Sequence, residues 1–372
     1  MRILAIGGAT QDVFIAISKS DLLTISKNGS SLQYLLFESG EKLEVENLSL
    51  HSGGGATNAS TSFKRLGFES VIFCKIKKDA AGQHITEELT KDGVITTLID
   101  TSSVEPTGQS FVLNTREGNR TIFVHRGANK TLDLSTLPID EIKKSNQLYI
   151  TSLSTHAAQM LPSITATAKQ FNVPVAINPG ASQLAKGTLL LKQSLKNIDI
   201  LIMNSSEARM FMAALVANDE SYREALESGT TTNACTLNLE TTNPYLIQSS
   251  LLCQNLYFSM NKFFIEALKM GPKIVVITNG ANGVYVAQHD TMYFHPSLKT
   301  TVVNTVGAGD AFGSCFVGSL LHGYTIPEAL RNGIVNSSSV LEHIGAKPGL
   351  LTLELLKQRI KNVPNLLQTF KL

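Results

Sequence analysis

The sequence lacks the features of a secreted, membrane-spanning or disulfide-stabilised chain. It has no tryptophan and only 4 cysteines in 372 residues. None of these cysteines forms a CxxC pair, so the sequence indicates neither a zinc ribbon nor a redox motif. Scattered cysteines are typical of a reducing compartment, and no apolar run approaches the ~20 residues of a membrane-spanning helix. We therefore expect a cytoplasmic protein with no membrane partner.

An excess of charge of one sign is also missing. Lys and Arg number 32 against 30 Asp and Glu, a net charge of +2, so no nucleic-acid partner is expected. Residues 1–8 are too short an apolar stretch for a signal peptide and are more typical of a first strand ending at two glycines. Hydrophobic residues make up 43% of the chain, enough for a large buried core.

Several well-known catalytic motifs are absent. There is no GxxxxGK[ST] loop, which excludes a P-loop enzyme. There is no HRD…N or DFG set, which excludes a protein kinase. GxGxxG, HExxH and GxSxG are missing as well, and the 8 histidines show no metal-ligand spacing. His51, His125 and His156 are interpreted as structural or surface residues.

The order of apolar runs and helical patterns predicts the fold class. Short continuous apolar runs predict strands buried on both faces, at 71–74, 147–150, 173–177, 199–203 and 273–277. Helical patterns lie between such runs, for example at 56–66, 80–92 and 155–170. This alternation predicts an α/β protein of one domain over residues 1–372, with a doubly wound, mostly parallel sheet covered by helices. Ligands of such sheets bind beyond the carboxyl ends of the strands.

Two regions depart from this alternation. Residues 108–125 predict a β-hairpin with a turn around 117–119, and parts of 13–50 also predict strands without intervening helices. These pieces are expected to form a small second sheet over the site. Residues 217–255 are rich in Ser, Thr and Asn and have no clear periodicity, so we interpret them as an insertion.

The segment Asn304–Phe312 carries the strongest chemical signal. Its glycines, Gly307 and Gly309, lie with Ala308 where a helical pattern begins. Free backbone N–H groups and the helix dipole at such a start bind anions. Asp310 would then lie beside a bound phosphate and could accept a hydroxyl proton, as phosphoryl transfer requires. The alternative is an aspartate that only caps its own helix.

Two glycine-containing turns nearer the N-terminus could bind a polyhydroxyl ligand. Gly53 and Gly54 precede a helix whose first turn holds Asn58, and glycines let a ligand approach the backbone. Asn58 can both donate to and accept from a hydroxyl. Asp12 follows the first strand and could accept hydrogen bonds from two vicinal hydroxyls. Flexible or capping turns are the alternative in both places.

Two further strand ends carry polar residues. Asn204 and Glu207 follow the strand that ends at Met203, where Ser205 could cap a helix. Glu207 could also hold a water of Mg²⁺, which keeps several waters in proteins. Thr278, Gly280 and Gly283 follow the strand that ends at Ile277. They could form a hairpin turn or a surface against which a nucleotide lies.

Taken together, these residues resemble the PfkB family of ribokinase-like carbohydrate and nucleoside kinases. The family's N-terminal signature is matched by Gly53, Gly54 and Asn58, and its Asn-x-x-Glu motif by Asn204 and Glu207. The nucleotide turn is matched at Thr278, Gly280 and Gly283, and the C-terminal signature at Thr305 and 307–310. The resemblance covers nearly the whole chain except 217–255.

The resemblance implies an ATP-dependent kinase for a hydroxyl group. Asp310 would be the general base, and the backbone of Gly307, Ala308 and Gly309 the anion hole. Asp12, Gly53, Gly54 and Asn58 would bind the substrate, while Asn204 and Glu207 would organise Mg²⁺ and phosphate. The nucleotide would contact Thr278, Gly280, Gly283 and Asn336. The hairpin at 108–125 would belong to a lid that in such kinases often forms a homodimer interface.

Departures from the family pattern leave the substrate open. Asn304 stands where the family usually has the Asp that helps to bind a monovalent cation, so potassium activation is in doubt. Residues 151–154 lack the carboxylate that contacts ribose in ribokinases, and Asn178-Pro179-Gly180 lacks the Asp-Pro-Asn of fructokinases. We therefore predict a sugar kinase, with a nucleoside kinase as the alternative. A sensor without catalytic activity is a third reading, which the intact Asp310 disfavours.

Overall fold

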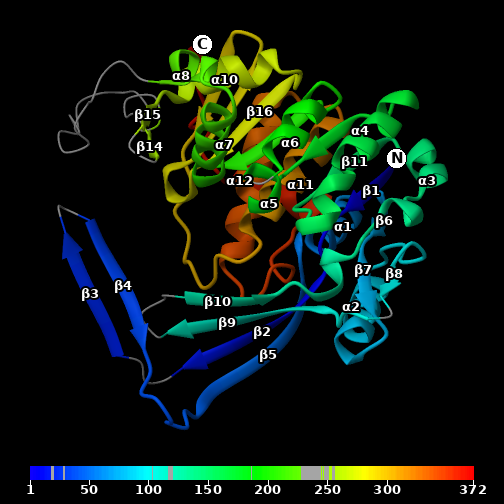
Figure 1. Ribbon diagram of the computed structural model, residues 1–372, viewed down its shortest axis with the longest axis vertical. Helices are drawn as coiled ribbons and strands as arrows, with labels where there is room; N and C mark the ends of the chain where they lie inside the picture. The colour runs from blue at the N-terminus through cyan, green and yellow to red at the C-terminus, as the bar shows by residue number, and fades with distance from the viewer. Residues whose placement is uncertain are drawn as a thin grey trace.

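The computed structural model consists of a large central sheet covered by helices and a smaller sheet beside it (Figure 1). It describes residues 1–17, 21–27, 30–102, 104–115, 120–185, 187–227, 244, 246, 251–253 and 256–372. The predicted α/β fold class with a mostly parallel, helix-covered sheet and a small second sheet is confirmed.

The central sheet has nine strands in the order β19-β18-β17-β16-β13-β12-β11-β1-β6. From β6 to β16 in this order, neighbouring strands pair in parallel. From β16 to β19, each strand pairs antiparallel with its neighbour. Their bounds are Arg2–Ile6 (β1), Glu69–Phe73 (β6), Gln147–Ile150 (β11), Val175–Ile177 (β12), Ile200–Asn204 (β13), Ile274–Thr278 (β16), Val284–Gln288 (β17), Thr291–His295 (β18) and Gln368–Lys371 (β19).

Helices cover both faces of this sheet because its side chains alternate between two apolar clusters. Ile202 and Val276 point into one cluster with α1 (Gly55–Arg65), α11 (Ala308–Leu321) and α12 (Ile326–Leu341). Leu201 and Val275 point into the other, with helices α4 (Leu161–Gln170), α6 (Thr188–Leu195), α7 (Ser205–Asn218) and α10 (Met260–Lys269). Other helices among the described residues are α2 (Ala80–Lys91), α3 (Ile139–Lys144), α5 (Ala181–Leu184), α8 (Ser221–Leu226) and α13 (Leu353–Lys361).

The single helix predicted at 155–170 is wrong in its first turns. Residues Thr155–Met160 form a 3₁₀ segment, and the α-helix begins at Leu161 with Pro162 in its first turn. A proline has no N–H to donate, so it suits the start of a helix and not its interior. The other 3₁₀ segments are Gly127–Lys130 (η1), Leu134–Thr136 (η2) and Gly280–Asn282 (η4).

The second sheet has four strands in the order β10-β9-β2-β5 and lies below the helical body in Figure 1. We call it the lid sheet. Its strands are Thr10–Ile17 (β2), Val45–Gly53 (β5), Gly108–Thr115 (β9) and Arg120–His125 (β10). The hairpin of β3 (Asp21–Lys27) and β4 (Ser30–Leu36) extends from it, and residues 117–119 lie outside the described part. Three-residue strands complete the fold: Lys75–Lys77 (β7), Asp100–Ser102 (β8), Leu251–Cys253 (β14) and Leu256–Phe258 (β15).

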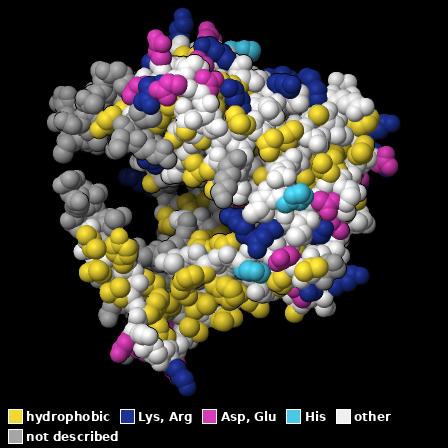
Figure 2. All heavy atoms as spheres, in the orientation of Figure 1, with side chains coloured by type: hydrophobic (Ala, Val, Ile, Leu, Met, Phe, Trp, Pro, Cys, Tyr) yellow, Lys and Arg dark blue, Asp and Glu magenta, His cyan; other side chains and the backbone are white. Residues whose placement is uncertain are grey.

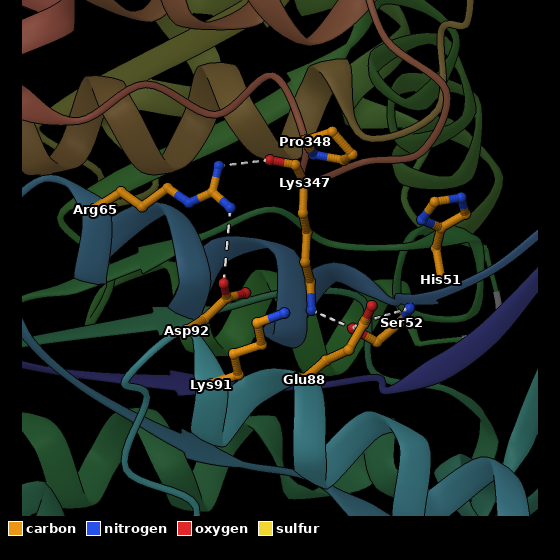
Figure 3. A pocket seen from close by; sticks show the side chains of 8 residues that line it. All are labelled: His51, Ser52, Arg65, Glu88, Lys91, Asp92, Lys347 and Pro348. Carbon is orange, nitrogen blue, oxygen red and sulfur yellow. Dashed lines mark hydrogen bonds and ion pairs between the residues drawn. The ribbon is translucent and has the colours of Figure 1, made fainter.

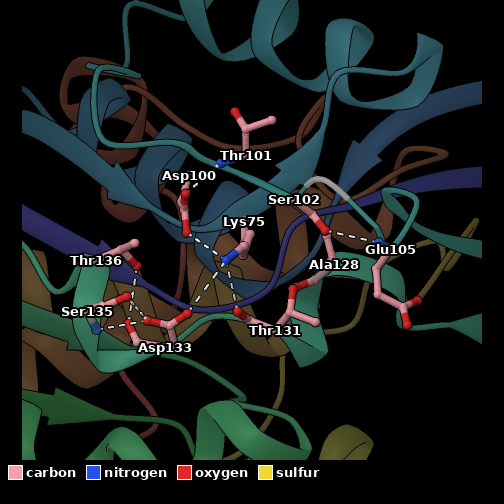
Figure 4. Close-up of polar contacts among 10 residues, drawn as sticks. All are labelled: Lys75, Asp100, Thr101, Ser102, Glu105, Ala128, Thr131, Asp133, Ser135 and Thr136. Atoms are coloured by element: carbon pink, nitrogen blue, oxygen red, sulfur yellow. Dashed lines mark hydrogen bonds and ion pairs between the residues drawn. The ribbon is translucent and has the colours of Figure 1, made fainter.

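The half-buried Lys75 contacts both the chain segment before the β9–β10 hairpin and the segment after it (Figure 4). Lys75 Nζ lies 2.9 Å from Asp100 Oδ2 and donates to Thr131 O at 3.0 Å. Asp100 precedes β9 and Thr131 follows η1, which comes after β10. The side-chain amide of Asn129 also exchanges two hydrogen bonds with the backbone of Ala9, at 2.9 and 2.8 Å. The base of the lid hairpin is therefore tied to the turn that leads to Asp12.

The predicted insertion at 217–255 lies partly outside the described residues, so its insertion character stays a prediction. Its described N-terminal part continues α7 and forms α8, which packs against α10. Leu226 on α8 is fully buried, and Leu246 is buried with its N–H donating to Tyr285 Oη at 3.1 Å. These contacts join this part of the chain to the apolar core. In the part of the chain that the structure describes, no helix is long and apolar enough to cross a bilayer.

Leu226→Ala should lower the free energy of unfolding by about 2–5 kcal/mol, because it opens a cavity in the core. The matched control is Leu189→Ala on α6, where the side chain is 53% exposed and the change should stay within about 0.5 kcal/mol. Urea denaturation measures both. If the two variants unfolded at the same urea concentration, α8 would not belong to the cooperative core.

Candidate active site

The polar residues singled out in the sequence lie beyond the carboxyl ends of the parallel strands, where ligands of such sheets bind. Asp12 lies on β2, the strand that follows β1, and Asn58 lies in the first turns of α1. Asn204 and Thr278 end the adjacent strands β13 and β16 and are paired in register. Asp310 lies in the first turn of α11. The fold thus brings residues from five parts of the chain to one edge of the sheet.

Asp310 and Asn58 are in direct contact. Asn58 Nδ2 donates a hydrogen bond of 2.8 Å to Asp310 Oδ2, although the two residues are 252 positions apart. Asp310 is half-buried. Loss of hydration raises the pKa of the Asp310 carboxyl, the Asn58 hydrogen bond lowers it, and the negative charge of Asp12 raises it again. Asp12 therefore lies near enough to interact electrostatically with Asp310.

The helix start at Gly307–Asp310 has the geometry of an anion site. Gly307 adopts the left-handed conformation with φ 81°, and a Cβ there would lie 2.3 Å from the Cβ of Ala346. A Cβ on Gly309 would meet no atom within 4 Å, so this side of the turn is open. The first N–H groups of an α-helix have no acceptor within the helix. The backbone of Gly307, Ala308 and Gly309 can therefore receive a negatively charged group beside Asp310.

Asp12 lies directly on the glycine turn that precedes α1. A Cβ on Gly53 would lie 1.9 Å from Asp12 Oδ2, so only glycine leaves room for the carboxylate. Gly54 has φ 95°, and a Cβ there would lie 2.5 Å from Gly8 O. Thr10 Oγ1 donates to Asp12 Oδ1 at 2.9 Å. Burial raises the pKa of Asp12, while hydrogen bonds from Thr10 and Ser110 and the charges of Lys347 and His51 lower it.

Asn204 and Glu207 form a capping box at the start of α7. Asn204 Oδ1 accepts from the N–H groups of Ser206 at 2.9 Å and Glu207 at 2.8 Å, and Glu207 Oε2 accepts from Asn204 N at 2.8 Å. The predicted helix start is confirmed, but Ser205 as its N-cap is wrong. The Asn204 side chain reaches both N–H groups from the N-cap position, so Ser205 begins the helix.

Glu207 is poised to interact with a cation. Burial raises the pKa of its carboxyl, the bond from Asn204 N–H lowers it, the charge of Asp310 raises it, and a bond with Asn178 lowers it. A divalent cation would relieve the repulsion between the two carboxylates. No group of three or more potential ligand side chains occurs among the described residues. A divalent cation at this place would need most of its ligands from water or from a bound ligand.

The turn after β16 leaves its backbone accessible. Gly280 has φ 53° and nothing within 4 Å of an added Cβ, whereas a Cβ on Gly283 would lie 2.5 Å from His295 O. The turn leads into β17, so the hairpin reading is correct. A nucleotide that lay against bare backbone here would be next to Asn204, the register partner of Thr278.

Comparison with known proteins decides the family. The model of the pfkB family of carbohydrate kinases matches residues 25–237 and 262–353. The chain belongs to the pfkB family. It is an ATP-dependent kinase with an alcohol group as acceptor, and ATP is its co-substrate.

Individual relatives show the breadth of this pfkB family. Ribokinase of Staphylococcus aureus is 25% identical over 325 residues, which cover 86% of this chain and 91% of that protein. The structure of Arabidopsis thaliana ribokinase complexed with ribose and ATP matches with a TM-score of 0.72 at 18% identity, covering 96% of this chain and 98% of the other. A nucleoside kinase of Methanocaldococcus jannaschii matches with a TM-score of 0.66 at 17% identity, covering 97% and 98%.

Asn336 is placed differently from the other residues of this pfkB-family site. It is fully buried on α12; its Nδ2 donates to Ala311 O and its Oδ1 accepts from Leu351 N, both at 2.9 Å. A side chain engaged in this way supports α11 from behind. We therefore do not carry a direct nucleotide contact by Asn336 into the proposal below.

Asn304 also has a structural task. Its Oδ1 accepts from Val306 N at 3.0 Å, and its buried Nδ2 has no partner among the described residues. The side chain thus shapes the turn that leads to Gly307 and carries no negative charge for a monovalent cation.

Sequence reasoning missed one polar residue of the site. Asn178 follows β12, donates to Ile202 O at 2.9 Å and interacts with the Glu207 carboxyl. The rule that ligands lie beyond the strand ends could have found it, because β12 is the neighbour of β13. It was weighed only as a departure from a fructokinase motif.

Asn58→Ala should move the acid limb of the kcat–pH profile to higher pH. The Asn58 hydrogen bond lowers the pKa of Asp310, so its loss raises that pKa, and the Asp310 carboxylate is protonated at a higher pH. kcat at saturating ATP and acceptor measures the shift. Asn218→Ala at the exposed end of α7 is the control and should leave the limb in place. Superimposable limbs for Asn58→Ala and wild type would contradict the contact.

Proposed function

We propose that this kinase phosphorylates a hydroxyl of a small sugar with Asp310 as general base. The observation that carries the proposal is the Asn58–Asp310 hydrogen bond of 2.8 Å, made where α11 begins with free N–H groups. It puts an amide able to bind a hydroxyl, a carboxylate able to take its proton and an anion-binding helix start in one place.

The proposed reaction needs only these groups and ATP. The acceptor oxygen attacks the γ-phosphorus, its proton passes to Asp310, and the bond to the ADP oxygen breaks. Charge on the transferred group is stabilised by the N–H groups of Gly307, Ala308 and Gly309. Asp12, Gly53, Gly54 and Asn58 orient the acceptor. The nucleotide lies along Thr278, Gly280 and Gly283, next to Asn204.

Mg²⁺ belongs to the proposal as the partner of ATP. Glu207 and Asn204 would hold it through water, and it would neutralise charge on the phosphates. The support is electrostatic, since the charge of Asp310 acts on Glu207 and raises its pKa.

A sugar is preferred over a nucleoside because relatives that align over most of both chains are named for sugar-type substrates, among them a ribokinase and a 2-dehydro-3-deoxygluconokinase. The nucleoside alternative rests on the fold shared with the archaeal nucleoside kinase. Ribose itself is not assigned, because Thr151 and Ser152 supply no carboxylate at the end of β11. The Thr151 side chain instead fills the space beside Gly7 and Gly55. A Cβ added to Gly7 would lie 2.0 Å from this side chain, and a Cβ added to Gly55 would lie 2.7 Å from it.

A turnover panel tests the function. ADP formation is measured with ATP and, in turn, ribose, 2-deoxyribose, fructose, 2-dehydro-3-deoxygluconate, fructose 6-phosphate, adenosine and cytidine. We expect one of the sugars to give the highest kcat/KM. A preference for adenosine or cytidine would favour the nucleoside alternative, and no turnover with any of them would favour the sensor.

Homodimerisation through the lid sheet is a second part of the proposal. Asp12 points to the site, so Val13 and its cross-strand neighbours point away from it. The register aligns Leu50, Val13, Phe111 and Phe123 in one row across all four lid strands. Three of these are exposed: Leu50 at 46%, Phe111 at 38% and Phe123 at 55%. Hydrophobic side chains gather over the lid strands in Figure 2. A continuous apolar row of this kind is typical of a protein interface.

The double variant Leu50→Asp/Phe123→Asp should be monomeric, while the wild type is a dimer, because two buried charges would oppose association. Sedimentation velocity measures the mass. The control Leu189→Asp changes an equally exposed leucine on α6 and should stay dimeric. A wild type that is monomeric at ~10 μM, well above the Kd of stable dimers, would exclude this interface.

Asp310→Asn should lower kcat by about 10²–10⁴-fold, the usual contribution of a general base. Asparagine keeps the shape but cannot accept the proton, and the N–H groups of the anion hole are unchanged, so ATP affinity should change little. Steady-state kinetics and calorimetry with ATP measure the two effects. Asp290→Asn in the exposed β17–β18 turn is the control. The N-cap of α11 is Gly307 and no side chain caps this helix, so the alternative of Asp310 as a helix cap is wrong. A rate within a few-fold of wild type would therefore leave Asp310 only its hydrogen bond with Asn58.

A further inference from the structure

A cavity of about 320 Å³ lies behind the glycine turn that precedes α1, the turn on which the Asp12 side chain lies (Figure 3). Its walls come from the end of β5, from α1, from α2 and from the segment between α12 and α13. Charged and polar side chains dominate its lining: Ser52, Arg65, Glu88, Lys91, Asp92 and Lys347. The cations and carboxylates nearly balance, so the cavity has no strong preference for an anion. Its polar groups are instead bonded to one another.

Lys347 is the most unusual of these groups. Its side chain descends through the centre of Figure 3 toward Ser52 and Glu88, and the residue is only 7% exposed. Lys347 Nζ donates to Ser52 Oγ. Ser52 in turn donates twice to Glu88 Oε2, through its hydroxyl and through its N–H at 2.8 Å. Burying an ammonium group costs free energy, because it loses hydration, unless hydrogen bonds and nearby carboxylates compensate for the loss.

Ser52, in the middle of the Lys347–Ser52–Glu88 chain of bonds, lies near the end of β5 in the lid sheet. Ser52 pairs with Gln11 and Gly53 with Thr10 across β2 and β5. Asp12 lies directly on Gly53. Arg65 donates to Lys347 O at 2.8 Å and to Leu350 O at 2.9 Å, which holds the Lys347 segment against α1. Asn58 lies on the same helix, α1. Lys347 therefore contacts the segments that position both proposed acceptor-binding side chains, Asp12 and Asn58.

We propose that Lys347 is a positioning residue for acceptor binding: it holds the Ser52–Gly53 backbone beneath Asp12 and places a positive charge near that carboxylate. The proposal deepens the proposed function and rests on it for the role of Asp12.

Electrostatics supports the second half of this role. Asp12 is buried, which raises its pKa; besides the Thr10 and Ser110 hydrogen bonds, the charges of Lys347 and His51 lower it. Removing the Lys347 charge therefore raises the pKa of Asp12, and the ionised form is lost at a higher pH. Burial lowers the pKa of Lys347 itself to about 8, although Glu88, Asp92 and Asp12 act against this and Arg65 adds to it. Lys347 is thus mainly charged below pH about 8. The other ionisable side chains facing the cavity are Lys91, His51 and, beside Glu88, His84.

The test compares Lys347→Met, Ser52→Ala and the control Lys91→Met in the full-length chain. Methionine keeps the volume of the lysine stem and removes its charge. Lys91 lines the same cavity, but its ammonium has no bond or ion pair within the described ranges. Carboxyl ¹³C NMR of aspartate-labelled protein, assigned with Asp12→Asn, gives the pKa of Asp12 without substrate. Steady-state kinetics with the preferred member of the sugar panel gives KM for the acceptor and for ATP.

Lys347→Met should raise the pKa of Asp12 and raise the acceptor KM about tenfold or more, the scale of a lost charged hydrogen bond, with the ATP KM nearly unchanged. Ser52→Ala should raise the acceptor KM with a smaller change in the pKa of Asp12, and Lys91→Met should do neither. A wild-type acceptor KM that rises above pH ~8, with no such rise in Lys347→Met, would add support. An Asp12 pKa and an acceptor KM both unchanged in Lys347→Met would overturn the proposal. An Asp12 pKa that rises in a protein inactive on the whole panel would leave the electrostatic contact standing and refute only the proposed function.

Discussion

The hydrogen bond between Asn58 and Asp310 is the contact on which the site depends, because it joins the two halves of the chain. Asn58 comes from α1 near the N-terminus and Asp310 from α11 near the C-terminus. The two helices pack along their length, with Ser314 Oγ donating to Ser62 Oγ at 2.7 Å one turn further on. Small residues make this approach close; an added Cβ on Gly318 would lie 3.1 Å from Leu66. Helix packing therefore sets the distance between the Asn58 amide and the Asp310 carboxylate.

The same helix packing brings several carboxylates close together. Their mutual repulsion costs free energy, and it changes pKa values in the direction that suits proton transfer. The charge of Asp12 acts on Asp310, the charge of Asp310 acts on Glu207, and each interaction raises a pKa. A base whose pKa is raised from its ordinary value is better matched to take a proton near neutral pH. A cation bound near these carboxylates would offset their repulsion.

Much of this arrangement could be predicted from the sequence, because local signals sufficed. Glycines before helical patterns marked the turns at Gly53 and Gly307, and apolar runs marked the buried strands of the parallel sheet. Local signals misled where two of them competed. The asparagine at 204 and the serine at 205 are both good caps, and only the geometry of the chain decides for Asn204. At 155–160 the helical periodicity predicts an α-helix, but the α-helix begins only at Leu161, with Pro162 in its first turn.

What could not be predicted depends on contacts between distant segments. A lysine in a loop, such as Lys347, gives no local sign that it will be buried against Ser52, 295 positions away. Asn336 looked like a residue for the nucleotide, yet α11 and the segment at Leu351 occupy its amide. Both residues lie behind the site and hold its elements in place. The residues proposed to meet the substrates can be predicted from motifs. The residues that hold them in place are found only when the packing of the helices and the lid sheet is known. A kinase that shares the motifs but differs in these supporting contacts could therefore present the same catalytic groups to a differently placed acceptor.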